Sequence, residues 1–177
     1  MTLSKSIRRL VPFALSVVLL ASSVVARGVD ERPATPPTTL RALYGIKPID
    51  ALTASKTAVV LVDFQREFVD GGLPLQAAPA AIFQARSLAA WAHRQGVPVV
   101  LVQQVTRKPG ARLFAAGAEM TSLVPGLQPA TGDLLVEKAL GGAFSQTNLN
   151  EKLRARGIDT LIVGGFMTHL AVQMTAT

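Results

Sequence analysis

A continuous apolar run at residues 58–62, Ala-Val-Val-Leu-Val, ends directly at Asp63 and constrains the fold more than any other segment. Its residues do not alternate with polar ones, and valines predominate, which is typical of a strand buried on both faces. A strand of this kind occurs in parallel sheets that helices cover on both sides. The run therefore predicts an α/β protein.

Further strands are predicted over 97–105, 133–137 and 160–163, and helical patterns separate them. An alanine-rich helix is expected over 77–95, with Gly96 as its C-terminal stop. A shorter helix is expected to follow Asn148, with Glu151 completing a capping box and Gly157 ending the helix. This alternation predicts a three-layer α/β/α domain with a mostly parallel sheet.

The carboxyl ends of the predicted strands carry polar residues and glycines. Asp63 closes the first strand, Lys138 follows the third, and residues 164–171 lead from the fourth strand into another helix. Ligands of open parallel sheets bind at this edge, because strand-end loops and helix N-termini converge there. A carboxylate, an amine and a glycine-led turn at one rim form a candidate catalytic group, although each piece alone also fits an ordinary loop.

Composition excludes several kinds of chemistry. The 177 residues contain no cysteine, so disulfides, thiolate metal sites and a cysteine nucleophile are excluded. Only two histidines occur, His93 and His169, and they stand far apart, so we expect no metal and no other cofactor. The net charge of +7 comes from scattered basic residues with one Trp and one Tyr, which argues against a nucleic-acid partner.

The N-terminal region has the pattern of a secretory signal peptide. Lys5, Arg8 and Arg9 precede an apolar run that ends in small residues near Ala26. We therefore expect residues 1–26 to be a signal peptide and the protein to be exported, periplasmic or secreted; an uncleaved membrane anchor is the alternative. Residues 27–56, rich in proline, are predicted to be a linker or N-terminal arm, and residues 57–177 to be the domain.

Three separated motifs resemble the isochorismatase-like cysteine hydrolase family. They are residues 60–68 (VLVDFQREF), residues 136–138 (VEK) with 142–149 (GAFSQTNL), and residues 165–169 (GFMTH), in the family's order and approximate spacing. The resemblance runs from about Ala58 to the last residue. It implies an isochorismatase-like fold that continues with at least one more strand and a helix, so this chain is expected to lack them, and it implies a homo-oligomer in many members.

The resemblance also implies a site built from an aspartate, a lysine and a cysteine that hydrolyses a C–N bond of a small molecule. Asp63 and Lys138 match the first two, and the cysteine position, six residues after Gly165, holds Ala171. Backbone N–H groups of Met167 and Ala171 match the oxyanion donors, beside a cis peptide bond expected at Phe166–Met167. The pattern of metal-binding residues found in nicotinamidases has no counterpart here.

Because an alanine methyl group cannot attack a carbonyl carbon, the family's covalent route is closed in this chain. The substitution is either a deliberate change, a natural feature of a non-catalytic member, or a sign that another group acts. The candidates for that group are the hydroxyl of Thr168 and a water activated by Asp63. The alternative function is that of a non-catalytic protein that binds a small molecule.

Aromatic residues close to the motifs are candidates for a substrate pocket, with core packing as the ordinary alternative. The long connection at residues 106–132 is a candidate lid over the pocket. The candidate substrate-binding residues are Phe64, Phe68, Phe144, Phe166 and His169.

Overall fold

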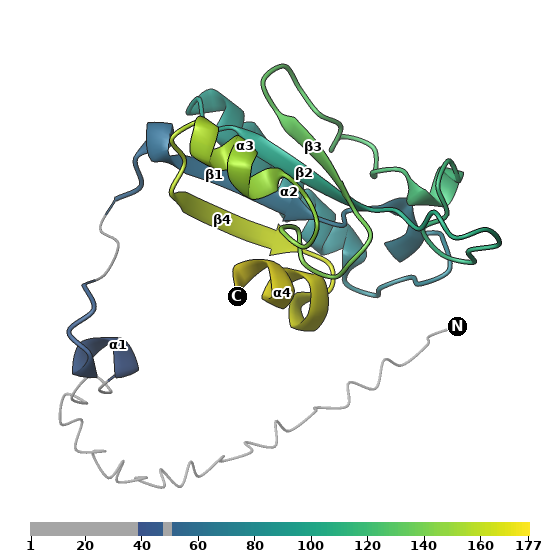
Figure 1. The fold of residues 1–177 in the computed structure, drawn as a ribbon, viewed down its shortest axis with the longest axis horizontal. Helices are drawn as coiled ribbons and strands as arrows, with labels where there is room; N and C mark the ends of the chain where they lie inside the picture. Colours follow the sequence, from purple (N-terminus) through teal and green to yellow (C-terminus); the bar gives the residue numbers. More distant parts are fainter. Residues whose placement is uncertain (1–38, 48–50) are drawn as a thin grey trace, which may run out of the picture. The chain divides into compact units, whose positions relative to one another are not determined.

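The computed structural model describes residues 39–47 and 51–177, in two units that divide between Lys47 and Pro48. The predicted signal peptide lies outside the described residues. In the first unit, the one-turn helix α1 (Leu40–Leu43) begins at Thr39, whose hydroxyl accepts a hydrogen bond from the Ala42 N–H. This helix falls within the predicted linker. The second unit holds the remaining elements (Figure 1).

A four-stranded sheet forms the centre of the second unit, and every neighbouring pair of strands is parallel. The strand order is β3-β2-β1-β4, so β1 and β2 are central while β3 and β4 are the edges of the described sheet. The sequence prediction of a parallel sheet is confirmed. The strands are β1 (Thr57–Val62), β2 (Val99–Gln104), β3 (Leu134–Lys138) and β4 (Thr160–Gly165).

Helices cover both faces of the sheet, which gives the three layers that the sequence predicts (Figure 1). Successive residues of a strand point to opposite faces. Val59 and Leu61 accordingly pack with the apolar face of α2 (Ala78–Arg94), whereas Val60 and Val62 pack with α3 (Leu149–Ala155) on the other side. These two apolar layers explain why the run at 58–62 has no polar member.

The chain after β4 forms a π-helical turn, η4 (Thr168–Val172), and then the short helix α4 (Gln173–Ala176). The described residues also form three 3₁₀ turns: η1 (Ala54–Lys56), η2 (Arg66–Phe68) and η3 (Glu119–Thr121). In the described part of the chain, no helix has the length and apolar character needed to cross a lipid bilayer.

The predicted ends of the helices are partly confirmed. α2 ends at Arg94, and Gly96 adopts a φ of 68°, the left-handed conformation that stops a helix. The capping box predicted at Asn148 is wrong, because the Asn148 side chain accepts no capping hydrogen bond. The hydroxyl of Thr147 accepts the Leu149 N–H instead, at 3.4 Å.

Candidate active site

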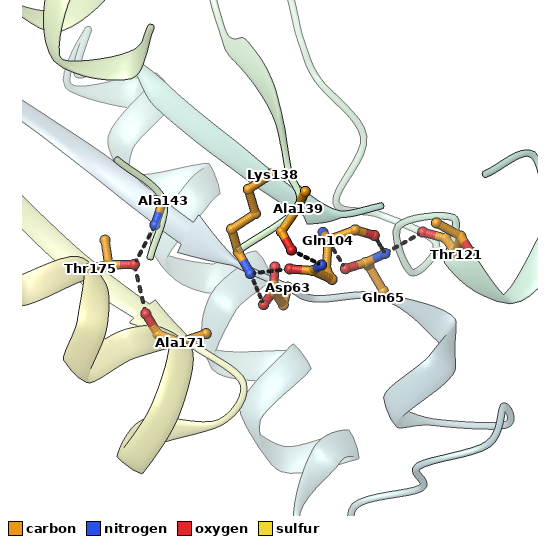
Figure 2. Close-up of polar contacts among 9 residues, drawn as sticks. All are labelled: Asp63, Gln65, Gln104, Thr121, Lys138, Ala139, Ala143, Ala171 and Thr175. Carbon is orange, nitrogen blue, oxygen red and sulfur yellow. Dashed lines mark hydrogen bonds and ion pairs between the residues drawn. The ribbon is translucent and has the colours of Figure 1, made fainter. Parts of the chain in front are cut away.

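The parallel sheet brings the ends of three neighbouring strands to one edge. Asp63 directly follows β1, Gln104 is the last residue of β2, and Lys138 is the last residue of β3. Because β2 lies between β1 and β3, the strand that ends at Gln104 lies between the strands that lead to the aspartate and the lysine. Figure 2 shows the three side chains converging on one another.

Asp63 and Lys138 form a buried ion pair. The Lys138 Nζ lies 2.8 Å from the Asp63 Oδ2, and the side chains are only 1% and 5% exposed respectively. The ammonium also donates a hydrogen bond to the Gln104 Oε1 at 2.8 Å. The structure therefore brings together the two charged residues that the motifs predict.

The carboxyl group of Asp63 has unusual properties. Burial raises the pKa of Asp63 from 3.8 to about 6, although the neighbouring charge and hydrogen bond of Lys138 act in the opposite direction. The Asp63 Oδ1 is buried and accepts no hydrogen bond from any described residue. A buried acceptor without a donor is costly and rare, so Oδ1 is available to an N–H or O–H group of a ligand.

The backbone of Asp63 is also held in an uncommon conformation. Its φ is 58°, in the left-handed region that residues other than glycine seldom adopt. The Asp63 N–H donates to the Val102 carbonyl at 2.9 Å, and the Asp63 carbonyl accepts the Gln65 N–H at 2.7 Å. Residues held in this way cluster at functional sites, because the surrounding contacts must offset the conformational cost.

Two glutamines support the pair, and sequence reasoning did not single them out. The Gln65 amide accepts the Gln104 N–H at 2.8 Å and donates to the carbonyls of Gln104 and Thr121. The Gln104 amide donates to the Ala139 carbonyl at 3.1 Å, so its oxygen faces Lys138 (Figure 2). The only sequence signal for Gln104 was its place at the end of a predicted strand.

The opposite wall of the site comes from the turn after β4. The Phe166–Met167 peptide bond is cis, as the family resemblance implied. No described residue accepts a hydrogen bond from the Met167 N–H. Ala171 is buried in η4, and its carbonyl accepts the Thr175 hydroxyl at 2.7 Å. The same hydroxyl accepts the Ala143 N–H at 3.0 Å, which ties η4 to the loop after Lys138 (Figure 2).

These elements surround one cavity of about 210 Å³. It brings together all four residues expected at the reaction centre, and two of the five candidate binding residues, Phe68 and Phe166, also line it. Its walls are Asp63, Phe68, Leu73, Gln104, Phe114, Lys138, Gly141, Phe166, Met167, Leu170 and Ala171.

Three candidate binding residues and one candidate nucleophile lie elsewhere. Phe64 is part of the core, with its ring centroid 4.7 Å from that of Phe166. Phe144 packs on the α3 side of the sheet and borders a different hollow, beside Leu153. His169 and Thr168 are exposed and do not line the cavity, although Leu170 and Ala171 of the same π-helical turn do. The periodicity of the sequence does not predict which way the side chains of these residues point.

The long segment between β2 and β3 contributes Phe114 to the cavity but is fastened to η2. The Thr121 carbonyl accepts the Gln65 side chain at 2.6 Å, and Arg66 forms ion pairs with Glu119 and Asp70. Glu67, which is buried, accepts the Gly72 N–H at 2.8 Å and the Phe114 N–H at 3.5 Å. These contacts link the segment to η2 and the residues around it, while the role of the segment as a lid stays a prediction.

A larger hollow, of about 490 Å³, lies near His93, Pro98 and Asp133, where β2 and β3 begin. It is therefore at the other end of the strands. The buried Asp133 carboxylate there accepts the N–H groups of Val99 and Ala130 and contacts His93, so its oxygens are already paired. Within residues 39–47 and 51–177, no group of three or more His, Asp or Glu side chains is placed to hold a metal ion.

Comparisons with known proteins agree with this geometry. The model of the isochorismatase domain matches residues 57–177. The secreted isochorismatase effector Isc1 of Verticillium dahliae is 31% identical over 136 residues, which cover 77% of this chain and 70% of Isc1. The ureidoacrylate amidohydrolase RutB of Agrobacterium fabrum is 30% identical over 156 residues, covering 69% and 68% of the two chains.

A solved structure gives the same result for the fold. The crystal structure of an isochorismatase from Pseudomonas putida superposes with a TM-score of 0.69 and 31% identity, over 78% of this chain and 70% of the other. The sequence match, the parallel sheet and the site at its carboxyl edge are thus consistent with one another. The chain belongs to the isochorismatase family.

Proposed function

We propose that the cavity binds a small amide-type molecule, and that this chain does not hydrolyse it through a covalent intermediate. The observation that carries the proposal is the combination of an unpaired Asp63 Oδ1, the Lys138 ammonium and the Ala171 methyl group around one cavity. The similarity to an amidohydrolase supports an amide as the ligand. The absence of cysteine from the sequence removes the thiol that the family's covalent route requires.

An amide group matches the polar atoms of the cavity. Its N–H can donate to the Asp63 Oδ1, which lacks a donor in the described structure. Met167 lines the cavity and its N–H has no described acceptor, so that N–H is a candidate donor to the carbonyl oxygen of the amide. The Lys138 ammonium offsets the negative charge of the Asp63 carboxylate, so a neutral polar group is suited to this position.

The test is to restore the thiol with Ala171→Cys. We expect the variant to release ammonia from primary amides that the unchanged chain only binds, because a thiolate would then lie beside Asp63 and Lys138. Ala171→Ser is the matched control for polarity and size, and it should remain much slower because a hydroxyl is a weaker nucleophile. Ala171→Cys with Asp63→Asn should lose the gained activity.

Binding must be measured in the same experiment, by titration with the amide in solution. Amide binding by the unchanged chain without turnover, together with turnover by Ala171→Cys, supports the proposal. If Ala171→Cys binds amides and remains folded but releases no ammonia, the site is not an amidohydrolase site that has lost its thiol. If the unchanged chain binds no amide, the amide-binding function itself is wrong.

A second candidate function is direct hydrolysis by a water molecule that Asp63 deprotonates. It is favoured by the Asp63 pKa of about 6, since a carboxylate with a raised pKa is a better general base. Hydrolysis by the unchanged chain, with a rate that rises as pH passes 6 and disappears in Asp63→Asn, would establish this function. A flat pH profile or activity retained by Asp63→Asn would exclude it.

We also propose that the protein is exported, with residues 1–26 removed. The basic residues Lys5, Arg8 and Arg9 before an apolar run support this, as does similarity to a protein described as secreted. Expression of the full chain with fractionation of the cells, followed by sequencing of the mature N-terminus, tests it. A protein that keeps Met1 and stays inside the cell would contradict export.

A further inference from the structure

We propose that the cavity selects amides whose remaining substituent is apolar and uncharged, and rejects amides that carry a carboxylate. The inference rests on the proposed amide-binding function and adds the substrate class. It follows from the contrast between the polar edge of the cavity and its apolar walls, and from the charge balance of the described side chains that line it.

Three of the residues that line the cavity are aromatic: Phe68, Phe114 and Phe166. The Phe68 ring lies between Phe114 and Phe166, with centroid distances of 5.4 Å and 5.6 Å respectively. Phe68 and Phe166 are buried, and the Phe68 ring meets its two neighbours at tilted or edge-on angles, as aromatic rings that pack together commonly do. An apolar substituent gains contacts with these rings, whereas a charged substituent finds no hydrogen-bond donor on them.

The rim of the cavity is also apolar. Leu73 and Leu170 line it and are 37% and 46% exposed respectively, so they lie where the cavity meets solvent. Neither leucine can pair with a charge. A substituent that extends from the amide toward these two side chains therefore meets aliphatic groups.

Lys138 is the single cationic side chain among the described residues that line the cavity. Its ammonium already faces the Asp63 carboxylate and the Gln104 amide oxygen, so its charge is balanced inside the protein. The nearby Arg66 and Arg107 do not line the cavity and are paired with exposed carboxylates. A ligand carboxylate would thus lose water without gaining a free cation from the residues that line the cavity, which is unfavourable.

The volume sets the size of the substituent. A cavity of about 150 Å³ is large enough to hold benzene. At about 210 Å³, this cavity has room for a carboxamide with a short alkyl chain or one ring. Small aliphatic and aromatic primary amides are therefore the class to test.

The experiment is an NMR titration of the full chain with three matched amides at pH 7.5. Butanamide carries a terminal methyl group, succinamate carries a carboxylate in its place, and succinamide carries an uncharged amide of nearly the same size as that carboxylate. Benzamide serves as the aromatic probe. We expect butanamide and benzamide to bind at least about tenfold more tightly than succinamate, with succinamide between them.

A change of charge at the rim provides the decisive variant. Leu73→Arg places a cation beside the cavity at a partly exposed position. It should reduce the ratio of the affinities for butanamide and succinamate by about threefold to fivefold. The matched control is Phe83→Arg, which adds the same charge on α2 at a side chain that is 65% exposed and does not line the cavity. The control should leave the difference unchanged, and thermal unfolding confirms that both variants are folded.

The outcomes separate this inference from the proposed function. If succinamate binds as tightly as butanamide, the selection against carboxylates is overturned while amide binding stands. If Phe83→Arg narrows the difference as much as Leu73→Arg does, the effect is one of net charge, and the role of the rim is overturned. If none of the amides binds, the proposed function is overturned, and the inference with it.

Discussion

The Nζ of Lys138 lies 2.8 Å from the Oδ2 of Asp63, in a place where both side chains are almost completely shielded from water. Loss of the ammonium would leave a carboxylate buried without its counter-ion. We therefore expect Lys138→Met to lower the free energy of unfolding at pH 7.5 by about 3–5 kcal/mol. Urea denaturation measures this change, with Lys108→Met as the control because Lys108 is exposed.

The double variant Asp63→Asn with Lys138→Met tests the cause of that loss. It removes both charges, so it should be more stable than Lys138→Met alone, because no unpaired buried charge remains. If the double variant is as unstable as the sum of the two single variants, the residues do not interact energetically and the interpretation of the pair is wrong.

The raised pKa of Asp63 predicts a specific dependence of stability on pH. Its pKa rises from 3.8 to about 6 on folding because of burial, so between these values the folded state binds more protons than the unfolded state. The group therefore adds to the free energy of unfolding in full below pH 3.8. This contribution falls as pH rises through about 6, and the free energy of unfolding no longer depends on the group above that pH. The contribution that is lost over this pH range is up to about 3 kcal/mol.

Asp63→Asn isolates this contribution, because asparagine does not titrate. The free energy of unfolding of the unchanged chain should fall relative to that of Asp63→Asn as pH rises from 4 to 7. Urea denaturation at a series of pH values measures it. A difference that does not change with pH would mean that the Asp63 pKa is the same in the folded and unfolded states.

The main features of the site were predictable because they depend on chain direction in a parallel sheet. Asp63 and Lys138 both come at the carboxyl end of a strand, so parallel pairing places them at one edge. The position of Gln104 beside this pair depends on the strand order β3-β2-β1-β4. That order comes from contacts between distant segments, which local apolar patterns do not contain.

The loops were less predictable than the strands. Phe68 and Phe144 both follow a strand and both looked suitable for a pocket, yet Phe68 lines the cavity and Phe144 packs on the α3 side. His169 is only two residues from Ala171, but the π-helical turn leaves His169 exposed and Ala171 buried. In irregular segments no period of two or 3.6 residues relates sequence to direction.

Thr175 holds together two walls of the site, and its replacement should be costly. Its hydroxyl accepts the Ala143 N–H and donates to the Ala171 carbonyl, all in a buried setting. Thr175→Val keeps the shape but leaves a buried N–H without an acceptor, so we expect a loss of about 1–3 kcal/mol in unfolding free energy. Thr175→Ser keeps the hydroxyl and should lose less.

Thr177→Val is the matched control for Thr175→Val. The Thr177 hydroxyl donates to the Gln173 carbonyl at 3.1 Å, which is the same local bond in an exposed position. Water can replace that bond, so the control should change stability by about 0.5 kcal/mol or less. If urea denaturation gives equal losses of unfolding free energy for Thr175→Val and Thr177→Val, the hydrogen bonds that link Ala143 to Ala171 through Thr175 do not stabilise the fold more than an exposed bond does.

Gly165 and Gly164 are neighbours in β4 with very different surroundings. A Cβ atom at Gly165 would lie 2.2 Å from the Val62 carbonyl oxygen, whereas a Cβ at Gly164 would meet no atom within 4 Å. Gly165→Ala must therefore push β4 away from β1, beside Asp63 and the turn that carries Met167. We expect a loss of about 3 kcal/mol or more in unfolding free energy, together with weaker binding of butanamide. Gly164→Ala should have little effect on either measurement. If urea denaturation and amide titration give the same values for both variants, the close approach of β4 to the end of β1 does not determine the shape of the site.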